Sequence, residues 1–241
     1  MTGEALVRVL HTSDIHIGLH EKLEPPEDHK PLIALEAVIN YAIETKVDLL
    51  LIAGDFFDNN RVKEPLINAG IEQLGRLNVP TVILPGNHDS LVPNSIYHKS
   101  DFQHRADLVE IITEPDGERF QFDHLNLSVW GRPHVSHDDF SPLTSPPAKG
   151  TMKWNFGIAH GHYVHSPADW GRAYPILPKE ISEANLDYIA LGHWDIFHAI
   201  SQGPVQAYYS GSPLTSQSCA LIKLKNDALS VEKIALKLPN D

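Results

Sequence analysis

The chain has almost no cysteine, no long apolar run and a shortage of positive charge. Its 241 residues include a single Cys, which excludes an internal disulfide and a cysteine-rich zinc site. No segment approaches the roughly 18 consecutive apolar residues of a membrane-spanning helix. The first residues also lack the basic segment followed by an apolar one that marks a signal peptide. We therefore expect a cytoplasmic protein that does not bind membranes.

Acidic residues outnumber basic ones, with 31 Asp and Glu against 19 Lys and Arg and a formal net charge of −12. This charge argues against a broad nucleic-acid-binding face, because such affinity comes largely from Lys and Arg on phosphates. Histidine, in contrast, is plentiful. Fifteen His residues in an acidic chain that is poor in cysteine point to metal chemistry with nitrogen and oxygen ligands.

The hydrophobic pattern predicts alternating strands and helices in the first half of the chain. Continuous apolar runs indicate strands at 5–13, 47–54 and 79–87, and helical periodicity begins at Pro31 and at Pro65. This β-α-β-α-β order implies a parallel sheet with right-handed crossovers.

The second half is richer in strands, and a short helix precedes one of them within 180–193. Further strands are expected at 108–113, 119–122, 125–131, 154–161, 205–213, 219–226 and 228–236. Neither an internal repeat nor a linker divides the chain. We expect a single domain over residues 1–241, with helices outside two packed sheets.

Clusters of Asp, Asn and His directly follow five of the predicted strands. Each cluster taken alone is an ordinary turn or cap sequence. In open α/β sheets, however, ligands bind outside the carboxyl ends of the strands, so the five clusters are expected to converge on one site. In chain order they are Asp14-Ile15-His16, Gly54-Asp55-Phe56-Phe57-Asp58, Gly86-Asn87-His88-Asp89, His160-Gly161-His162 and Gly192-His193-Trp194-Asp195.

The joint pattern resembles the calcineurin-like metallophosphoesterases. Their signature, in order, is DxH, GDxxD, GNH with an acidic residue, a His after a later strand, and GHxH. The resemblance covers nearly the whole chain. It implies an α/β fold, namely a four-layer αββα sandwich of two mixed sheets flanked by helices. It also implies two divalent metal ions that hydrolyse phosphate esters through a bridging water.

The resemblance assigns metal ligands residue by residue. Ligands without thiolate suit Mn, Fe, Zn or Mg. Asp55 would bridge the two ions, Asp14 and His16 would hold the first, and Asn87, His160 and His193 would hold the second.

The same resemblance implies a catalytic pair. His88 would lie beside the scissile phosphate, where it stabilises the transition state or protonates the leaving oxygen. Asp58 would accept a hydrogen bond from His88 and fix its orientation. Arg132, His134 and His162 are candidate substrate-binding residues, and His162 is also an alternative ligand in place of His160.

The last motif departs from the family pattern, because Asp195 stands where a second His ligates the first metal. Two alternatives are open. A carboxylate still coordinates and gives the site a harder character that favours Mn or Mg over Zn. Alternatively, Asp195 is too short to reach, and a water or a neighbour such as His198 replaces it.

Four segments are similar to the nuclease component of SbcCD-type DNA repair exonucleases: VLHTSDIHIG, GDFFDNNRV, DYIALGHWD and YYSGSPLTSQ. In that branch the reaction is phosphodiester hydrolysis, usually with Mn, and the nuclease has an ATPase partner. Those nucleases carry a further C-terminal capping region, for which this chain has little room. We therefore expect a catalytic core acting on a nucleotide, a short nucleic acid or a model phosphodiester.

These observations favour a dinuclear-metal-dependent phosphodiesterase with a nuclease-like core. Two alternatives remain. One is a small-molecule phosphomonoesterase with the same centre. The other is a non-catalytic binding protein weakened by the change from GHxH to GHWD, although the pair of His88 and Asp58 favours an enzyme. The physiological substrate, the native metals and the oligomeric state are left open.

Overall fold

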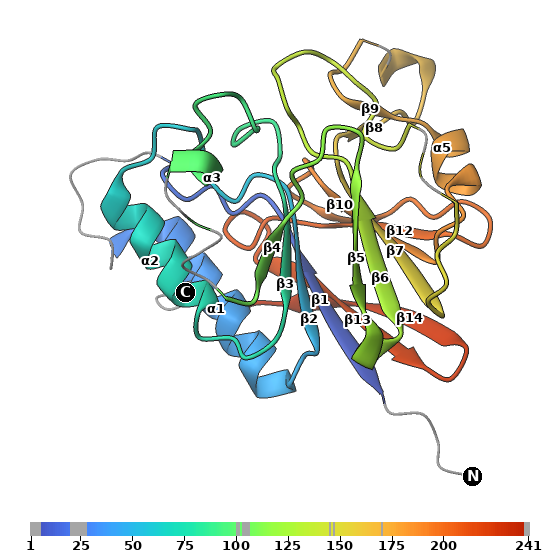
Figure 1. Ribbon diagram of the computed structural model, residues 1–241, viewed down its shortest axis with the longest axis horizontal. Coiled ribbons are helices and arrows are strands. Elements are labelled where there is room, and N and C mark those ends of the chain that lie inside the picture. Colours follow the sequence, from blue (N-terminus) through green and yellow to red (C-terminus); the bar gives the residue numbers. More distant parts are fainter. Residues whose placement is uncertain are drawn as a thin grey trace.

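Two six-stranded mixed sheets pack face to face (Figure 1). The computed structural model describes residues 6–19, 28–99, 102, 107–144, 146, 148–169 and 171–238. The strand order is β14-β13-β1-β2-β3-β4 in the first sheet and β11-β12-β10-β7-β6-β5 in the second, and β8 pairs with β9 in a small separate sheet.

The first sheet has the predicted β-α-β-α-β unit at its centre. Its strands are β1 (Val7–Thr12), β2 (Leu49–Ala53), β3 (Thr81–Leu84), β4 (Val109–Ile111), β13 (Ser218–Lys225) and β14 (Ala228–Ala235). Strands β1 to β4 run parallel, whereas β13 and β14 are added antiparallel. Helices α1 (Lys30–Thr45) and α2 (Glu64–Leu74) each have Pro in the first turn, where its missing N–H is harmless.

The second sheet has a parallel centre and antiparallel edges. Its strands are β5 (Glu118–Phe122), β6 (Leu127–Gly131), β7 (Trp154–His160), β10 (Tyr188–Gly192), β11 (Phe197–Ala199) and β12 (Gln206–Ser210). The remaining short elements are α3 (Ile96–Lys99), α5 (Pro178–Glu183), β8 (His162–Tyr163), β9 (Pro175–Ile176) and two 3₁₀ turns, Asp123–Leu125 and Pro167–Asp169. Strands β8, β9 and β11 were not predicted from the sequence.

The core consists of three apolar layers. One lies between the sheets and includes Leu51, Phe156 and Tyr188, all fully buried. A second lies under α1 and α2, which cover the outer face of the first sheet (left in Figure 1). The third covers the outer face of the second sheet, beneath α5 and adjoining loops. This is the expected sandwich, with one helical layer reduced to a short helix.

Strand β2 shows why its sequence is continuously apolar. All five of its residues are fully buried, because helices cover one face of the sheet and the second sheet covers the other. Among the described residues, no helix combines the length and apolarity that crossing a bilayer requires.

Candidate metal centre

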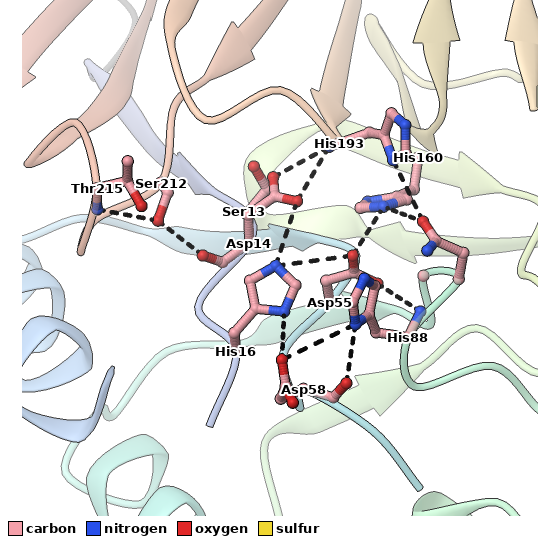
Figure 2. Close-up of polar contacts among 12 residues, drawn as sticks. Ser13, Asp14, His16, Asp55, Asp58, His88, His160, His193, Ser212 and Thr215 are labelled. Carbon is pink, nitrogen blue, oxygen red and sulfur yellow. Dashed lines mark hydrogen bonds and ion pairs between the residues drawn. The ribbon is translucent and has the colours of Figure 1, made fainter. Parts of the chain in front are cut away.

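The polar clusters meet where the carboxyl ends of the two sheets come together (Figure 2). Asp14, Asp55 and Asn87 lie in the loops that follow β1, β2 and β3 of the first sheet. His160 is the last residue of β7, and His193 directly follows β10 of the second sheet. The predicted convergence of these clusters is therefore found, and it spans both sheets.

Four residues of the cluster have left-handed backbone conformations. Their φ angles are 54° at Asp14, 56° at His16, 53° at Asp55 and 103° at His193. Such conformations cost about 1–3 kcal/mol each and cluster at functional sites. The two loops of the first sheet hold each other in place, since Asp14 N donates to Gly54 O at 3.1 Å and His16 N to Asp55 O at 3.0 Å.

Glycine allows the loops to approach closely at two positions. Gly54 has a φ of 91°, and a Cβ there would collide with the His160 ring. A Cβ at Gly86 would collide with the Asp55 carboxylate. Any side chain at either position would therefore push apart residues that now lie in contact.

Three acceptor-bearing groups face one another at the centre. His160 Nε2 lies 3.1 Å from Asp55 Oδ2 and 3.0 Å from Asn87 Oδ1. Its other nitrogen, Nδ1, lies 2.9 Å from the Ala53 carbonyl, to which it must donate. In the neutral ring the Nε2 lone pair therefore points at two oxygens, an arrangement that only a proton or a metal cation can stabilise.

The pKa values of His160 and Asp55 also indicate that this buried site favours a positive charge. Burial alone would lower the pKa of His160, but the carboxylates of Asp55 and Asp14 raise it to about 10. Burial would raise the pKa of Asp55, yet the neighbouring His160 holds it well below its usual value. A bound cation would take the place of the proton on His160.

His193 completes this donor set. Its Nδ1 lies 3.2 Å from Asn87 Oδ1. Burial and the nearby His160 lower its pKa to about 4, so the ring is neutral, as a ligand must be. Carboxylate, amide and imidazole donors fit a divalent first-row metal ion, and we call Asp55, Asn87, His160 and His193 the compact set.

A second group of donors is more widely spaced. His16 Nε2 lies 3.9 Å from both Asp14 Oδ1 and Asp55 Oδ2. Both oxygens of Asp14 face the main-chain N–H of His193, at 3.0 and 3.2 Å. Burial raises the pKa of the Asp14 carboxyl. We call Asp14 and His16 the open set, which shares Asp55 with the compact set.

His88 lies at the exposed side of the open set. Its ring is 4.8 Å from that of His16, and its side chain is 45% exposed. One donor atom of His88 falls within 4.8 Å of donors on His16 and Asp55. His88 therefore lies at the exposed edge of the centre, and its place beside a scissile phosphate stays a prediction.

Asp58 contacts His88 differently from the expected geometry. His88 Nδ1 donates to the main-chain carbonyl of Asp58 at 2.8 Å, whereas the carboxylate is 3.9 Å away (Figure 2). That carboxylate lies closer to His16 Nδ1, at 3.5 Å. The main chain of Asp58 is fixed by its N–H bond to Ile17 O at 2.9 Å, which brings the carbonyl rather than the carboxylate against His88.

Of the predicted ligands, Asp195 has the side chain with the fewest contacts to the metal-type donors among the described residues. Its side chain is exposed, and within the described part of the chain its carboxylate joins neither group of metal-type donors. Its main-chain carbonyl accepts a hydrogen bond from Ser212 N at 3.0 Å. The alternative ligand, His198, is also exposed and lies 5.8 Å from the Trp194 ring. Coordination by either residue stays a prediction.

The structure does not place His134 at the rim of the site. The side chain is fully buried behind His160, and its Nε2 donates to the His160 carbonyl at 2.8 Å. Burial and the nearby His160 lower the pKa of His134 to about 3, so the ring is neutral. This contact across 26 residues of sequence has no local pattern that would predict it.

His162 and Arg132 lie outside the donor sets. Trp194 Nε1 donates to His162 Nδ1 at 3.1 Å, which leaves the proton of the neutral His162 ring on Nε2. The His162 ring is 6.2 Å from that of His193. Arg132 donates through Nε to Pro115 O at 3.0 Å and stacks over Phe140. His162 is thus beside the centre, and Arg132 is held by Pro115 of the connection between β4 and β5 and by Phe140.

Asp89 and Tyr97 support the centre in a way that sequence analysis missed. The buried carboxylate of Asp89 accepts hydrogen bonds from Gly86 N at 2.7 Å and Phe57 N at 3.0 Å. The Tyr97 hydroxyl donates to the same carboxylate at 2.6 Å. These bonds join the loops that carry Asp55 and Asn87. The acidic residue after Gly-Asn-His was the only available signal.

Comparison with known proteins identifies the family. A family model described as calcineurin-like phosphoesterase matches residues 7–196. The chain belongs to this family. The protein TT1561 of Thermus thermophilus has a similar structure, with a TM-score of 0.64 over 95% of this chain and 99% of that one. At 14% identity this likeness shows the fold alone.

Two curated relatives are similar in sequence. The DNA double-strand break repair protein Mre11 of Saccharolobus solfataricus is 26% identical over 205 residues, which cover 78% of this chain and 49% of that protein. The SbcD component of the nuclease SbcCD of Bacillus subtilis is 24% identical over 254 residues, covering 86% of this chain and 62% of the relative. The chain thus spans only part of the length of the relatives it matches.

Proposed function

We propose that the chain is a phosphodiesterase with a nuclease-like core that works with two divalent metal ions, preferably Mn²⁺. The compact set would hold one ion and the open set the other, with Asp55 shared between them. The observation that carries the proposal is the set of facing acceptors at His160, Asp55 and Asn87, 3.0 and 3.1 Å apart, which need a proton or a metal cation between them.

The chemistry follows from the position of His88. When bound, the two ions supply an activated water and neutralise charge on the phosphate. His88 keeps a proton on Nδ1, because the Asp58 carbonyl only accepts. Its Nε2 has no hydrogen-bond partner in the described part of the chain, so in the doubly protonated ring it is free to donate to a phosphate oxygen or to pass its proton to the leaving oxygen.

The substrate class proposed is a nucleotide or a short nucleic acid. The names of the relatives, a double-strand break repair protein and a nuclease component, favour a phosphodiester over a phosphomonoester. The net charge of −12 weakens any grip on a long duplex. His162, with a proton on Nε2 beside His193, is the better placed of the candidate substrate-binding residues, and an ATPase partner follows from the SbcD-type resemblance.

The proposal is tested with bis(p-nitrophenyl) phosphate and p-nitrophenyl phosphate in the presence of Mn²⁺. We expect the diester to be hydrolysed faster, and His88→Ala to lower kcat by about 10²–10⁴-fold while bound Mn²⁺ is retained. Faster turnover of the monoester would favour the phosphomonoesterase alternative. No turnover of either ester by folded, metal-loaded protein with Mn²⁺, Mg²⁺, Zn²⁺ or Fe²⁺ would overturn both enzymatic functions.

A further inference from the structure

A buried pair of serine contacts joins the loop after β1 to the turn after β12. Ser212 Oγ donates to the main-chain carbonyl of Asp14 at 2.8 Å, and Ser13 Oγ lies 3.1 Å from Ser210 Oγ. The three serines are at most 1% exposed. Figure 2 shows Ser212 reaching toward Asp14 from the side opposite the metal-type donors. These contacts connect the two sheets directly behind the open set.

The hydroxyl of Ser212 has a single proton, and that proton goes to Asp14. Its oxygen accepts the N–H groups of Leu214 and Thr215, both at 3.3 Å, which fixes the direction of the hydroxyl. The main-chain N–H of Ser212 donates to the Asp195 carbonyl at 3.0 Å. One residue therefore holds both the Asp14 loop and the loop between β10 and β11 that contains Asp195.

Asp14 depends on such support. Its backbone has a φ of 54°, a conformation that persists only when the surroundings impose it. The direction of its carboxylate follows from the orientation of its peptide groups. Loss of the Ser212 hydroxyl would leave the Asp14 carbonyl unpaired in a buried position and free the loop to turn.

We propose that Ser212 is a positioning residue for Asp14 and thereby sets the affinity of the open set for its metal ion. The inference rests on the proposed function, because it assumes that the open set binds metal. Ser212 touches no member of the compact set by any hydrogen bond between described residues, so the ion held there should be unaffected.

The test is a calorimetric Mn²⁺ titration of wild type, Ser212→Ala and Ser218→Ala, with thermal unfolding of each metal-free protein. Ser218 is a matched control: it is the fully buried first residue of β13, directly after the turn that carries Ser212, and its hydroxyl donates to Ser210 O at 3.0 Å rather than to the Asp14 loop. We expect the open set to give the weaker of the two Mn²⁺ binding steps. Ser212→Ala should lower the Mn²⁺ affinity of that step by about 10- to 100-fold, as loss of a group that orients a metal ligand does. The tighter step and the control should be unchanged.

The outcomes separate this inference from the function on which it rests. Wild type that binds no Mn²⁺ would overturn both. Two Mn²⁺ steps in wild type that persist unchanged in Ser212→Ala would overturn the positioning role alone, as would equal weakening in both serine variants. If Ser212→Ala does not fold, Ser212→Cys keeps nearly the size of the side chain but replaces the hydroxyl with a much weaker donor, and an unchanged weaker step in that variant would also overturn the role.

Discussion

The two halves of the candidate metal centre differ in how closely they are packed. In the compact set, His160 Nε2 lies 3.0 Å from Asn87 and 3.1 Å from Asp55, and the His160 side chain is fully buried. In the open set, His16 Nε2 lies 3.9 Å from Asp14, and the His16 side chain is 17% exposed. The fold therefore preorganises one cation position more strictly than the other.

The difference follows from where the ligands are attached. The compact set comes from the ends of β2, β3, β7 and β10, whose strands pack across the interface between the sheets. The open set depends on the single loop after β1, which carries both Asp14 and His16, and on position 195, whose side chain is exposed. We expect the compact set to bind its metal ion more tightly.

The largest expected effect is that of His160→Ala. It removes the ring that contacts both Asp55 and Asn87, so tight Mn²⁺ binding should be lost, and diester hydrolysis should fall by more than about 100-fold. Steady-state kinetics and calorimetry measure both. His124→Ala, at an exposed His outside the donor sets, is the control. Undiminished Mn²⁺ affinity in His160→Ala would contradict the expectation that the compact set binds its metal ion more tightly than the open set.

Asp14→Asn should act mainly on the open half, although a carboxylate oxygen of Asp14 also lies within 4.8 Å of donor atoms of Asp55 and His160. The amide keeps the size of the side chain but removes its charge, so the weaker Mn²⁺ step should be lost and the tighter one kept. Hydrolysis should fall by about 10- to 100-fold at limiting Mn²⁺ and recover in part at high Mn²⁺. Loss of the tighter step together with the weaker one would show that the two halves do not bind independently.

The stability of the metal-free protein should depend on pH through the compact half. The pKa of His160 is raised from 6.5 to about 10, so the folded state holds an extra proton between these values. This stabilisation is fully present below pH 6.5 and is lost as pH rises through about 10. Thermal unfolding of wild type should therefore show a steeper alkaline decline than that of His160→Gln. Equal declines would contradict the electrostatic account of His160.

The smallest expected effect is a gain in the Mn²⁺ affinity of the open set. Asp195→His restores the spacing of the family pattern at the exposed end of the open set. We expect the weaker Mn²⁺ step to tighten by up to about tenfold, with the tighter step unchanged. A Mn²⁺ titration of the variant measures the change. A weaker open site in Asp195→His would indicate that Asp195 itself is a ligand.

The sequence predicted the part of this site that follows local patterns. Apolar runs located the strands, and the polar residues after β1, β2, β3, β7 and β10 converged as expected, because the ends of parallel strands meet at one edge. It did not predict β8, β9 or β11, which are only two or three residues long and carry too little periodicity.

Contacts that depend on packing between distant segments were also missed. Ser212 and Asp14 are 198 residues apart, and nothing near either one predicts their hydrogen bond. The burial of His134 behind His160 and the use of the Asp58 carbonyl rather than its carboxylate are of the same kind. Such details arise when the two sheets come together.

The most direct test of the account is the number and affinity of Mn²⁺ ions bound by the wild-type chain. Equilibrium titration, followed by calorimetry and by the electron paramagnetic resonance of free Mn²⁺, should show two ions per chain in two separate steps. The tighter step should disappear in His160→Ala and the weaker in Asp14→Asn. No bound ion, or two equal steps that neither variant alters, would contradict a centre with one compact and one open half.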